Sequence, residues 1–419
     1  MSSQLWPIVA LGAYCSKIGS GSTPRGGESV YQDSGVSFIR SQNVYNGFFT
    51  PNGLAYLGED HADQLKGVTV EPGDVLLNIT GDSVARCCRA PEDVLPARVN
   101  QHVAIIRPSA EAFDSRFLGY YFISPFMQDT MLSLAGSGGT RKALTKEMIE
   151  RFEVPRPPRL VQEQLAGILA AYDDLIENNR RRMVLLEDAA RQLYREWFVR
   201  LRFPGYEHSR ICDGVPAGWR WLPLEQLCSD GDGIQTGPFG SQLHQSDYAD
   251  DGVPVVMPKD LVNLRIAVDS IARIPEDLAN RLGRHRMMQG DTVYGRRGDI
   301  GRRAYVGRRQ VGWFCGTGSL RIRPERTMVD PRFLFDALGA PETAATIANR
   351  AKGSTMPNLS AGALKSVPVL VPTRVLQDFY SEQVEPLCEM RETLEEQNHK
   401  LRAARDLLLP RLMSGEIAV

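Results

Sequence analysis

The order of segments in the first half of this chain recurs in its second half. Gly35-Val36 returns as Gly252-Val253. Gly73-Asp74-Val75 returns as Gly290-Asp291-Thr292, and each half closes with a proline-containing stretch and a long helical pattern. A repeat of this length is a whole domain, because the units of a solenoid have only about 20–45 residues. The sequence therefore predicts two similar globular modules, each followed by one long helix.

Both long helical patterns carry a heptad seam. In the first, the two rows are Leu169, Ile176, Met183, Ala190 and Trp197, and Tyr172, Asn179, Leu186 and Leu193. In the second, they are Leu387, Leu394, Leu401 and Leu408, and Val384, Arg391, Asn398, Arg405 and Leu412. Such a seam predicts that the helices pair, and a polar residue in it fixes register at a cost in stability. We expect an antiparallel coiled-coil spacer rather than core helices of two unrelated domains.

Short β-rich runs broken by glycine and proline alternate with amphipathic helices in both modules. Val75–Ile79 and Thr292–Tyr294 are two such runs, and helices are expected at 117–134 and 331–350. This mixture predicts an α+β fold, with a mixed sheet of short strands and peripheral helices. The predicted divisions of the chain are a first module at 1–158, a helix at 159–203, a second module at 204–372 and a helix at 373–419.

The sequence lacks the motifs of several enzyme classes. It has no GxxxxGK[ST] loop and no HExxH motif, and its six histidines show no paired spacing. Seven cysteines without a CxxC pair favour the reducing cytoplasm over a disulfide framework or a zinc site. No apolar run approaches the roughly 20 residues of a membrane span, and no secretory signal is visible. We therefore expect a cytoplasmic protein with no catalytic residues and no metal site of its own.

The overall charge hides one strongly basic segment. The formal net charge is -1, which argues against a free-standing nucleic-acid binder. Between residues 281 and 309, however, there are nine arginines and only two acidic residues, Asp291 and Asp299. A solvated arginine-rich surface is the alternative, but the local excess favours contact with phosphates.

The loops at the strand ends carry side chains suited to DNA. Arginine, lysine, asparagine and glutamine make bidentate contacts with base edges, and hydroxyl groups suit phosphates. In the first module, the candidates are Arg40, Ser41, Gln42, Asn43, Asn78, Thr80, Asn100, Gln101, His102, Thr140, Arg141 and Lys142. In the second, they are Gln235, Ser241, Lys259, Tyr294, Arg296, Arg297, Arg302, Arg303, Ser354 and Thr355. Polar, glycine-rich loops are usually plain turns. Their recurrence with different side chains is what two modules reading two different sequences would show.

Several segments, in order, make the chain resemble the specificity subunit of a type I restriction-modification system. The second module opens with Gln235-Thr236-Gly237-Pro238-Phe239-Gly240-Ser241-Gln242-Leu243, and the first contains Phe38-Ile39-Arg40-Ser41-Gln42-Asn43-Val44. The segments 73–81, 100–103, 194–199 and 408–417 also fit. The resemblance covers almost the whole length. The second module departs from the pattern, because Met257-Pro258-Lys259-Asp260 replaces the Arg40–Asn43 type of segment and the Asn-Gln pair before Ser319 is missing.

The resemblance implies two target-recognition domains separated by the antiparallel helices, each domain reading one half of a bipartite DNA site. It implies that the subunit is not catalytic and binds no cofactor itself. Its partners would be double-stranded DNA, two methyltransferase subunits and ATP-dependent motor-nuclease subunits. S-adenosylmethionine, ATP and Mg²⁺ would belong to those partners.

Three other interpretations remain open at this point. A stand-alone regulator with two half-site readers would bind DNA tightly without partners. A methyltransferase or nuclease with degenerate motifs would turn over S-adenosylmethionine or cut DNA as isolated protein. A purely structural coiled-coil adaptor is disfavoured, because most of the chain is globular.

Overall fold

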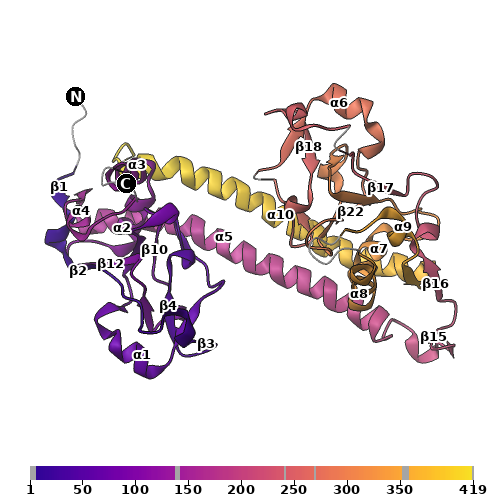
Figure 1. The fold of residues 1–419 in the computed structure, drawn as a ribbon, viewed down its shortest axis with the longest axis horizontal. Helices are drawn as coiled ribbons and strands as arrows, with labels where there is room; N and C mark the ends of the chain where they lie inside the picture. The colour runs from indigo at the N-terminus through magenta and orange to yellow at the C-terminus, as the bar shows by residue number, and fades with distance from the viewer. Residues whose placement is uncertain (1–5, 137–141, 240–241, 269, 352–357, 418–419) are drawn as a thin grey trace. The chain divides into compact units, whose positions relative to one another are not determined.

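The computed structural model describes residues 6–136, 142–239, 242–268, 270–351 and 358–417. It divides into two compact units, each treated separately below. Unit 1 comprises Met1–Arg181 with Leu394–Val419, and unit 2 comprises Arg182–Thr393. Each unit thus contains one module and a part of both long helices, labelled α5 and α10 in Figure 1. Within the described ranges, no helix has the length and apolar character needed to cross a bilayer.

Unit 1 is built on two small sheets. The four-stranded sheet is antiparallel, in the order β10 (Cys87–Arg89), β9 (Val75–Asn78), β12 (Val103–Pro108) and β2 (Cys15–Ser20). The five-stranded sheet is mixed, in the order β3 (Tyr31–Gln32), β7 (Ala55–Leu57), β4 (Val36–Ile39), β11 (Ala97–Val99) and β8 (Thr69–Val70), with β4 and β11 parallel. The smaller pairs are β1 (Ile8–Ala10) with β13 (Glu153–Pro155) and the hairpin of β5 (Val44–Tyr45) and β6 (Phe48–Phe49).

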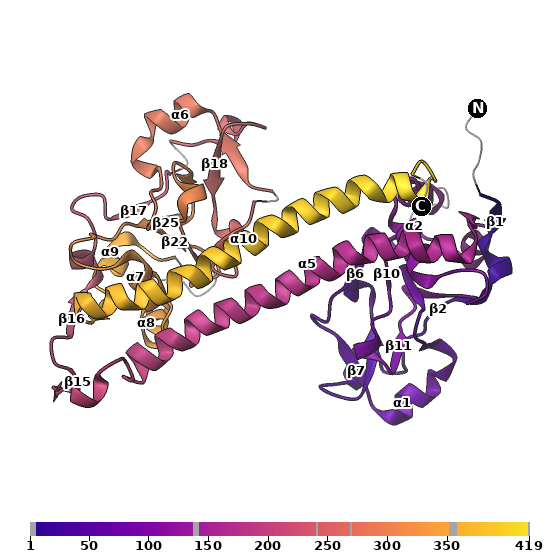
Figure 2. The same ribbon diagram turned by 180° about the vertical axis from the view of Figure 1, so that it is seen from behind.

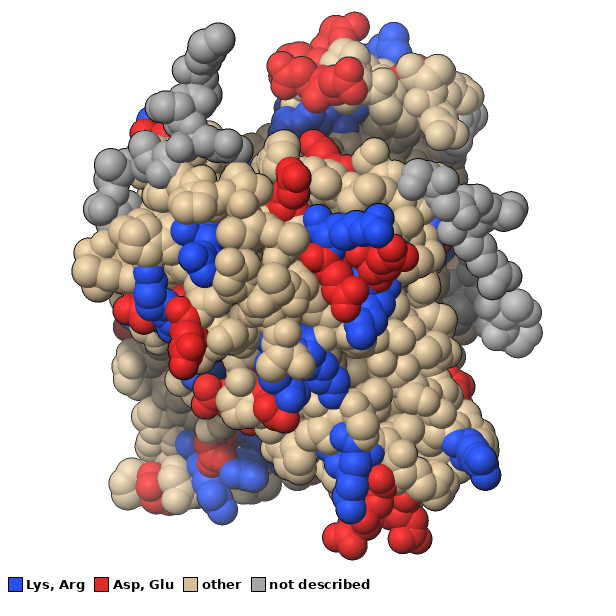
Figure 3. Space-filling view, turned by 90° about the vertical axis from the view of Figure 1, so that its left-hand side faces the viewer, with Lys and Arg blue, Asp and Glu red and all other residues tan. Residues whose placement is uncertain are grey.

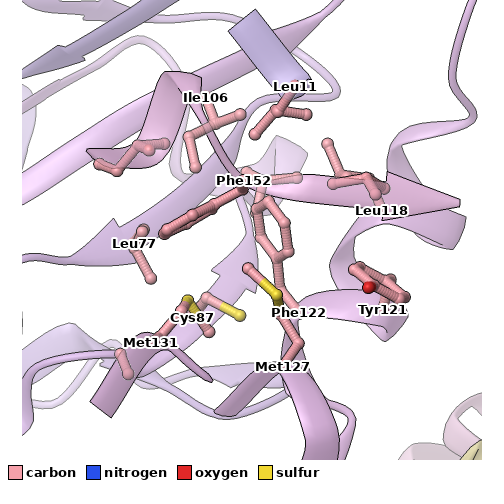
Figure 4. Close-up of a cluster of buried hydrophobic side chains, with 14 of the residues drawn as sticks. Leu11, Leu77, Cys87, Ile106, Leu118, Tyr121, Phe122, Met127, Met131 and Phe152 are labelled. Atoms are coloured by element: carbon pink, nitrogen blue, oxygen red, sulfur yellow. The ribbon is translucent and has the colours of Figure 1, made fainter. Parts of the chain in front are cut away.

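The helices of unit 1 pack against these sheets. They are α1 (Glu59–Gln64), α2 (Ser115–Ile123), α3 (Pro125–Gly136) and α4 (Lys146–Glu150). Figure 4 shows the core that results beside the four-stranded sheet, where the rings of Phe122 and Phe152 meet edge to face with centroids 6.1 Å apart. Leu77 from β9 and Ile106 from β12 are fully buried in the same cluster. Strands buried on both faces explain why their sequences read as continuous apolar runs.

Unit 2 repeats this plan. Its four-stranded sheet has the order β17 (Ile234–Thr236), β25 (Ser319–Ile322), β22 (Thr292–Gly295) and β23 (Arg303–Tyr305). A three-stranded sheet has the order β21 (Ala272–Ile274), β18 (Val253–Val256) and β24 (Phe314–Cys315). Its paired strands are β16 (Arg220–Pro223) with β26 (Pro368–Val371), β19 (Leu261–Val262) with β20 (Arg265–Ile266), and β14 (Ile211–Cys212) with β15 (Val215–Pro216). Its helices are α6 (Glu276–Arg281), α7 (Pro331–Ala337), α8 (Pro341–Arg350) and α9 (Ala361–Lys365).

Equivalent buried contacts confirm the α+β fold as a duplication. In unit 1, the Arg107 guanidinium donates through Nε to Asp74 at 2.7 Å. In unit 2, Arg323 donates through Nε to Asp291 at 2.9 Å. In both, a second guanidinium nitrogen reaches the other carboxylate oxygen, which makes the pair bidentate. The repeat in the sequence therefore corresponds to a repeat of internal contacts.

Two helix predictions need correction. The single helix expected at 117–134 is two helices, because α2 ends before Ser124-Pro125 and α3 begins at Pro125. The helix expected at 331–350 is likewise α7 and α8, separated before Pro341. Proline has no N–H for the preceding turn and pushes the residue before it toward an extended conformation, so each proline starts a new helix.

The long helices pack antiparallel within each unit, as expected for the spacer. Helix α5 spans Arg159–Tyr194 and α10 spans Arg374–Met413. In unit 1, Asn179 Nδ2 donates to Asn398 Oδ1 at 3.0 Å, and Asp173 pairs with Arg405. In unit 2, Glu187 lies 3.6 Å from Arg391. Residue numbers rise along α5 as they fall along α10, which is the antiparallel order.

The seam residues are buried to different degrees. Along α5 and the turn that follows it, the row Leu169, Ile176, Met183, Ala190 and Trp197 is buried, and so is Asn179. Tyr172, Leu186 and Leu193 are partly exposed, as are Leu387, Leu401 and Leu408 on α10, whereas Leu394 and Asn398 are buried. After Tyr194 the helix widens into a π-helical turn, Arg195–Val199. That turn adds one residue, which allows the adjacent side chains Trp197 and Phe198 both to be buried.

Replacing one asparagine of the Asn179–Asn398 pair should destabilise the chain more than replacing both. Asn179→Leu leaves the Asn398 amide buried without its donor, so we expect a loss of about 1–3 kcal/mol in the free energy of unfolding. The double variant with Leu at both positions should recover most of that loss, because two apolar side chains leave no unsatisfied amide. Urea denaturation of both variants measures this. Arg181→Ala, on the exposed side of α5, is the control, and a single variant as stable as wild type would contradict the argument.

Candidate nucleic-acid interface

Four segments of unit 1 meet where the strands of its four-stranded sheet end. The Ile79 N–H donates to the His102 carbonyl at 2.9 Å, and the Leu144 N–H donates to the Ile79 carbonyl at 2.9 Å. The Ser22 N–H donates to the Val99 carbonyl at 3.0 Å. These bonds bring the loop after β2, the loop after β9, the loop before β12 and the segment 142–144 together. The sequence predicts candidate contacts in the second, third and fourth of these segments, the last through Lys142, and the structure brings the three together.

A chain of polar side chains crosses this junction. Thr80 Oγ1 lies 2.6 Å from His102 Nδ1, and Gln101 Nε2 lies 3.1 Å from His102 Nε2. The Thr23 hydroxyl donates to Gln101 Oε1. We call Thr23, Thr80, Gln101 and His102 the polar loop cluster. Because Gln101 and His102 are exposed, the cluster offers donors and acceptors to a partner in solution.

Three asparagines among the candidates are buried and shape the loops. Asn43 Nδ2 donates to the Thr50 carbonyl at 3.0 Å, and Asn78 Nδ2 donates to the Ser41 carbonyl at 2.9 Å. Asn100 Oδ1 accepts from the His102 N–H at 3.1 Å. These amides hold neighbouring segments in place, so their direct contact with DNA remains a prediction. Asn78 Oδ1 stays buried without a partner among the described residues.

The segment Arg40–Asn43 forms a short 3₁₀ helix, Ser41–Asn43, with Arg40 as its N-cap residue. The Arg40 guanidinium donates to the Gly53 carbonyl at 2.7 Å and stacks over the Tyr31 ring at 5.3 Å. Gln42 Nε2 donates to the same carbonyl at 3.0 Å and is exposed. Lys142 is also exposed. Thr140 and Arg141 lie outside the described residues.

Unit 2 builds the same junction from different side chains. The Arg296 N–H donates to the Gly318 carbonyl at 3.0 Å, and the Leu359 N–H donates to the Arg296 carbonyl at 2.8 Å. These bonds make Arg296 the counterpart of Ile79 and Gly318 the counterpart of His102. In place of the polar loop cluster, unit 2 has Arg296, Arg297 and Thr317. Arg296 and Arg297 follow β22 and Thr317 precedes β25, and these two strands lie side by side in the sheet, with β17 next to β25 (Figure 2).

The second-module candidates separate into exposed and buried groups. Arg297, Arg302 and Lys259 are exposed, and Gln235 is partly exposed on β17. Tyr294 is fully buried in the core of unit 2. The Arg303 guanidinium stacks on Phe335 at 5.0 Å, and burial lowers its pKa. Ser241, Ser354 and Thr355 lie outside the described residues.

The arginine-rich segment 281–309 is not one continuous surface. Arg286 pairs with Glu276 at 2.6 Å, and Arg302 pairs with Asp299 at 2.8 Å. Arg303 points into the protein, as described above. The arginines available to phosphates are therefore fewer than the sequence suggests. Figure 3 shows a face of unit 1, and there too basic and acidic side chains lie next to one another.

Sequence reasoning missed three contributors to these junctions. Thr23 completes the polar loop cluster in unit 1, and Phe239 and Asn358 contact Arg296 in unit 2. None has a distinctive spacing, since each comes from a loop joined to the site only by folding. Asn358 could have been found by aligning the two repeats, because its bridge to Arg297 matches that of Ala143 to Thr80. The described ranges hold no group of three or more His, Cys, Asp or Glu residues placed to bind a metal.

Comparison with known proteins identifies similar chains. The type I restriction modification DNA specificity domain matches residues 6–187. The MjaIX type I restriction enzyme specificity subunit of Methanocaldococcus jannaschii is 25% identical over 77% of this chain and 74% of its own length. The HindI specificity subunit of Haemophilus influenzae is 22% identical over 91% of this chain and 94% of its own length. The crystal structure of a type I system S subunit from M. genitalium shares the fold, with a TM-score of 0.61 at 15% identity, and covers 98% of this chain and 97% of its own.

A methyl group at Gly21 should disrupt the junction of unit 1. A Cβ there would overlap the carbonyl oxygens of Val99 and Asn100, whereas a Cβ at Gly19, two residues earlier, meets nothing within 4 Å. We expect Gly21→Ala to cost roughly 1–3 kcal/mol of unfolding free energy. Gly19→Ala is the matched control and should be neutral or slightly stabilising.

Hydrogen exchange locates the effect of these variants. In Gly21→Ala, the amides of Ser22 and Ile79 should lose protection, because their acceptors lie in the displaced segments. Equal protection in the two variants would show that the close approach at Gly21 is not needed.

Proposed function

We propose that this chain is a specificity subunit of a type I restriction-modification system and that it reads a bipartite DNA site, one half with the module of each unit. As a specificity subunit it is a non-catalytic member of a multisubunit complex. The observation that carries the proposal is the pair of loop junctions. Both rest on the same backbone hydrogen bonds but present different side chains, as two readers of different sequences require.

The first half-site reader is the polar loop cluster with its neighbours. Gln101 and His102 are exposed and bear both donors and acceptors, and Gln42 and Lys142 are exposed on the adjoining loops. Glutamine pairs in a bidentate manner with adenine, which needs a fixed amide orientation. The contacts of Gln101 with Thr23 and His102 supply that orientation. The buried asparagines support these loops.

The second half-site reader is more basic. Arg296 and Arg297 occupy the turn after β22, and Lys259 is exposed at the turn after β18. Arginine makes bidentate contacts with guanine, and lysine suits phosphate or guanine. A short set of positive side chains is compatible with a near-neutral chain if partner subunits supply further phosphate contacts.

We further propose that the long helices set the gap between the half-sites and hold two methyltransferase subunits, with motor-nuclease subunits joining that complex. Helix α5 alone has 36 residues, a length of about 54 Å at 1.5 Å per residue. S-adenosylmethionine, ATP and Mg²⁺ would act in those partners. A stand-alone DNA-binding regulator is the competing function, and tight, sequence-specific binding by the isolated chain would favour it.

Sequencing of N6-methyladenine tests the proposal directly. The chain is expressed with its neighbouring methyltransferase in a host that lacks DNA methylation, beside the methyltransferase alone. We expect a split motif only when this chain is present. If the two proteins associate but methylation is absent, or its motif does not depend on this chain, the proposed function is wrong.

Substitutions in one junction should affect one half of the motif. Gln101→Ala should relax the motif in the first half-site only, and Arg297→Ala should weaken recognition of the second half-site only. A lost base contact corresponds to about 1–3 kcal/mol, or roughly 5- to 150-fold in discrimination. The same methylation sequencing measures both, and each variant is the control for the other half. Equal losses in both halves would contradict the modular assignment.

A further inference from the structure

Arg296 is held in a fixed orientation where its counterpart in unit 1 is apolar. The backbone bonds that match Arg296 to Ile79 place both residues directly after equivalent strands, β22 and β9. Ile79 is buried and carries no polar side-chain atom. Arg296 is also buried, at 8% exposure, and burial lowers its pKa. Burying a charged guanidinium without an ion pair costs free energy, and an acceptor on a bound partner would offset that cost.

Two neighbours fix the guanidinium plane. Asn358 Oδ1 accepts from both Arg296 Nε and Arg296 Nη2, at 3.4 and 3.2 Å. The Phe239 ring lies with its centroid 5.9 Å from the Arg296 guanidinium carbon, and Phe239 itself is 55% exposed. The amide oxygen at one edge of the guanidinium and the nearby aromatic ring restrict the rotation of the side chain.

The Nη1 group of Arg296 has no hydrogen-bond partner among the described residues. A guanidinium carries five N–H groups, and Asn358 uses only the edge formed by Nε and Nη2. Nη1 donates to no residue in the described part of the chain and is not among its fully buried atoms without a partner, so Nη1 keeps some contact with solvent although the side chain as a whole is buried. The edge formed by Nη1 and Nη2 presents two parallel donors, which match the O6 and N7 acceptors of guanine in the major groove.

We propose that Arg296 reads a guanine in the second half-site and that Asn358 and Phe239 are its positioning residues. This inference rests on the proposed function. It gives the two half-sites different chemistry at equivalent positions, since Ile79 cannot hydrogen-bond to a base. Arg297 is exposed and has no comparable restraint among the described residues, so its contact with a base should discriminate less than that of Arg296.

Three variants in the complex with the methyltransferase test the proposal. Arg296→Gln should lower the preference for guanine at one position of the second half-site by roughly 5- to 150-fold, or shift it toward adenine. Arg296→Lys keeps the charge but loses the bidentate fork, so it should also relax that position. Asn358→Ala should relax it to a smaller extent, because the arginine remains but is less restrained. Arg220→Gln, on β16 outside the junction, removes the same charge and is the matched control.

The readout is the methylation motif, with the first half-site as an internal standard. The proposal is supported if the preference for guanine at one position of the second half-site relaxes only in the Arg296 and Asn358 variants. A second half-site without guanine, or a guanine preference unchanged in Arg296→Gln, overturns it. If Arg296→Lys keeps the motif while Arg296→Gln lowers methylation equally at all sites, Arg296 contacts phosphate and the proposal is wrong.

Two further outcomes keep the inference separate from the proposed function. If Arg296→Gln does not co-purify with the methyltransferase, Arg296→Lys and Asn358→Ala decide, and unchanged discrimination in both overturns the inference. The absence of any split motif with the wild-type chain would instead overturn the proposed function. A normal split motif with an unaltered second half overturns only the role of Arg296.

Discussion

One buried glutamine in each unit joins the module to its long helix, and the rest of the fold depends on that join. Gln162 is fully buried, accepts from the Asp114 N–H at 2.8 Å and donates to the Pro157 carbonyl at 2.9 Å. Gln377 makes the same two bonds, with the Asp330 N–H and the Pro372 carbonyl. Each side-chain amide thus hydrogen-bonds to a backbone N–H at the start of a module helix and to a backbone carbonyl in the proline-containing turn before the long helix. Loss of one partner would leave buried polar groups unpaired, which is expensive.

With the modules anchored in this way, the strand ends become a frame on which side chains can vary. The backbone bonds around Ile79 recur around Arg296, although the two residues share no chemistry. Backbone hydrogen bonds do not depend on side-chain identity, so the loops can change composition while the frame stays constant. Exposed Gln101 and His102 in one unit, and Arg296 with Arg297 in the other, show how far that variation goes. A recognition protein needs this separation between a constant frame and variable contacts.

Much of the fold could be predicted, and the misses have specific physical causes. The heptad seam predicts that the two long helices pair, because an apolar period of seven residues is typical of helices that pack along one shared stripe. The helices expected at 117–134 and 331–350 were wrong in their continuity, since Pro125 and Pro341 each begin a new helix. Among the site residues, Tyr294 and Arg303 are on the correct strands but point into the protein. Which side of a short strand faces the core depends on the second sheet and the helices packed on it, and periodicity over three or four residues cannot decide that.

The sequence by itself determined the duplication, the paired helices and the type of fold, because these follow from repeated order and from hydrophobic periodicity along the chain. Only the tertiary structure decided which loops meet. Thr23 hydrogen-bonds to Gln101, and Arg296 hydrogen-bonds to Asn358, although the partners lie far apart in the sequence. The burial of Asn43 and Asn78, which makes them supports of the loops, was likewise decided by packing. Such contacts depend on the register of strands distant in sequence, and a local pattern holds no information about that register.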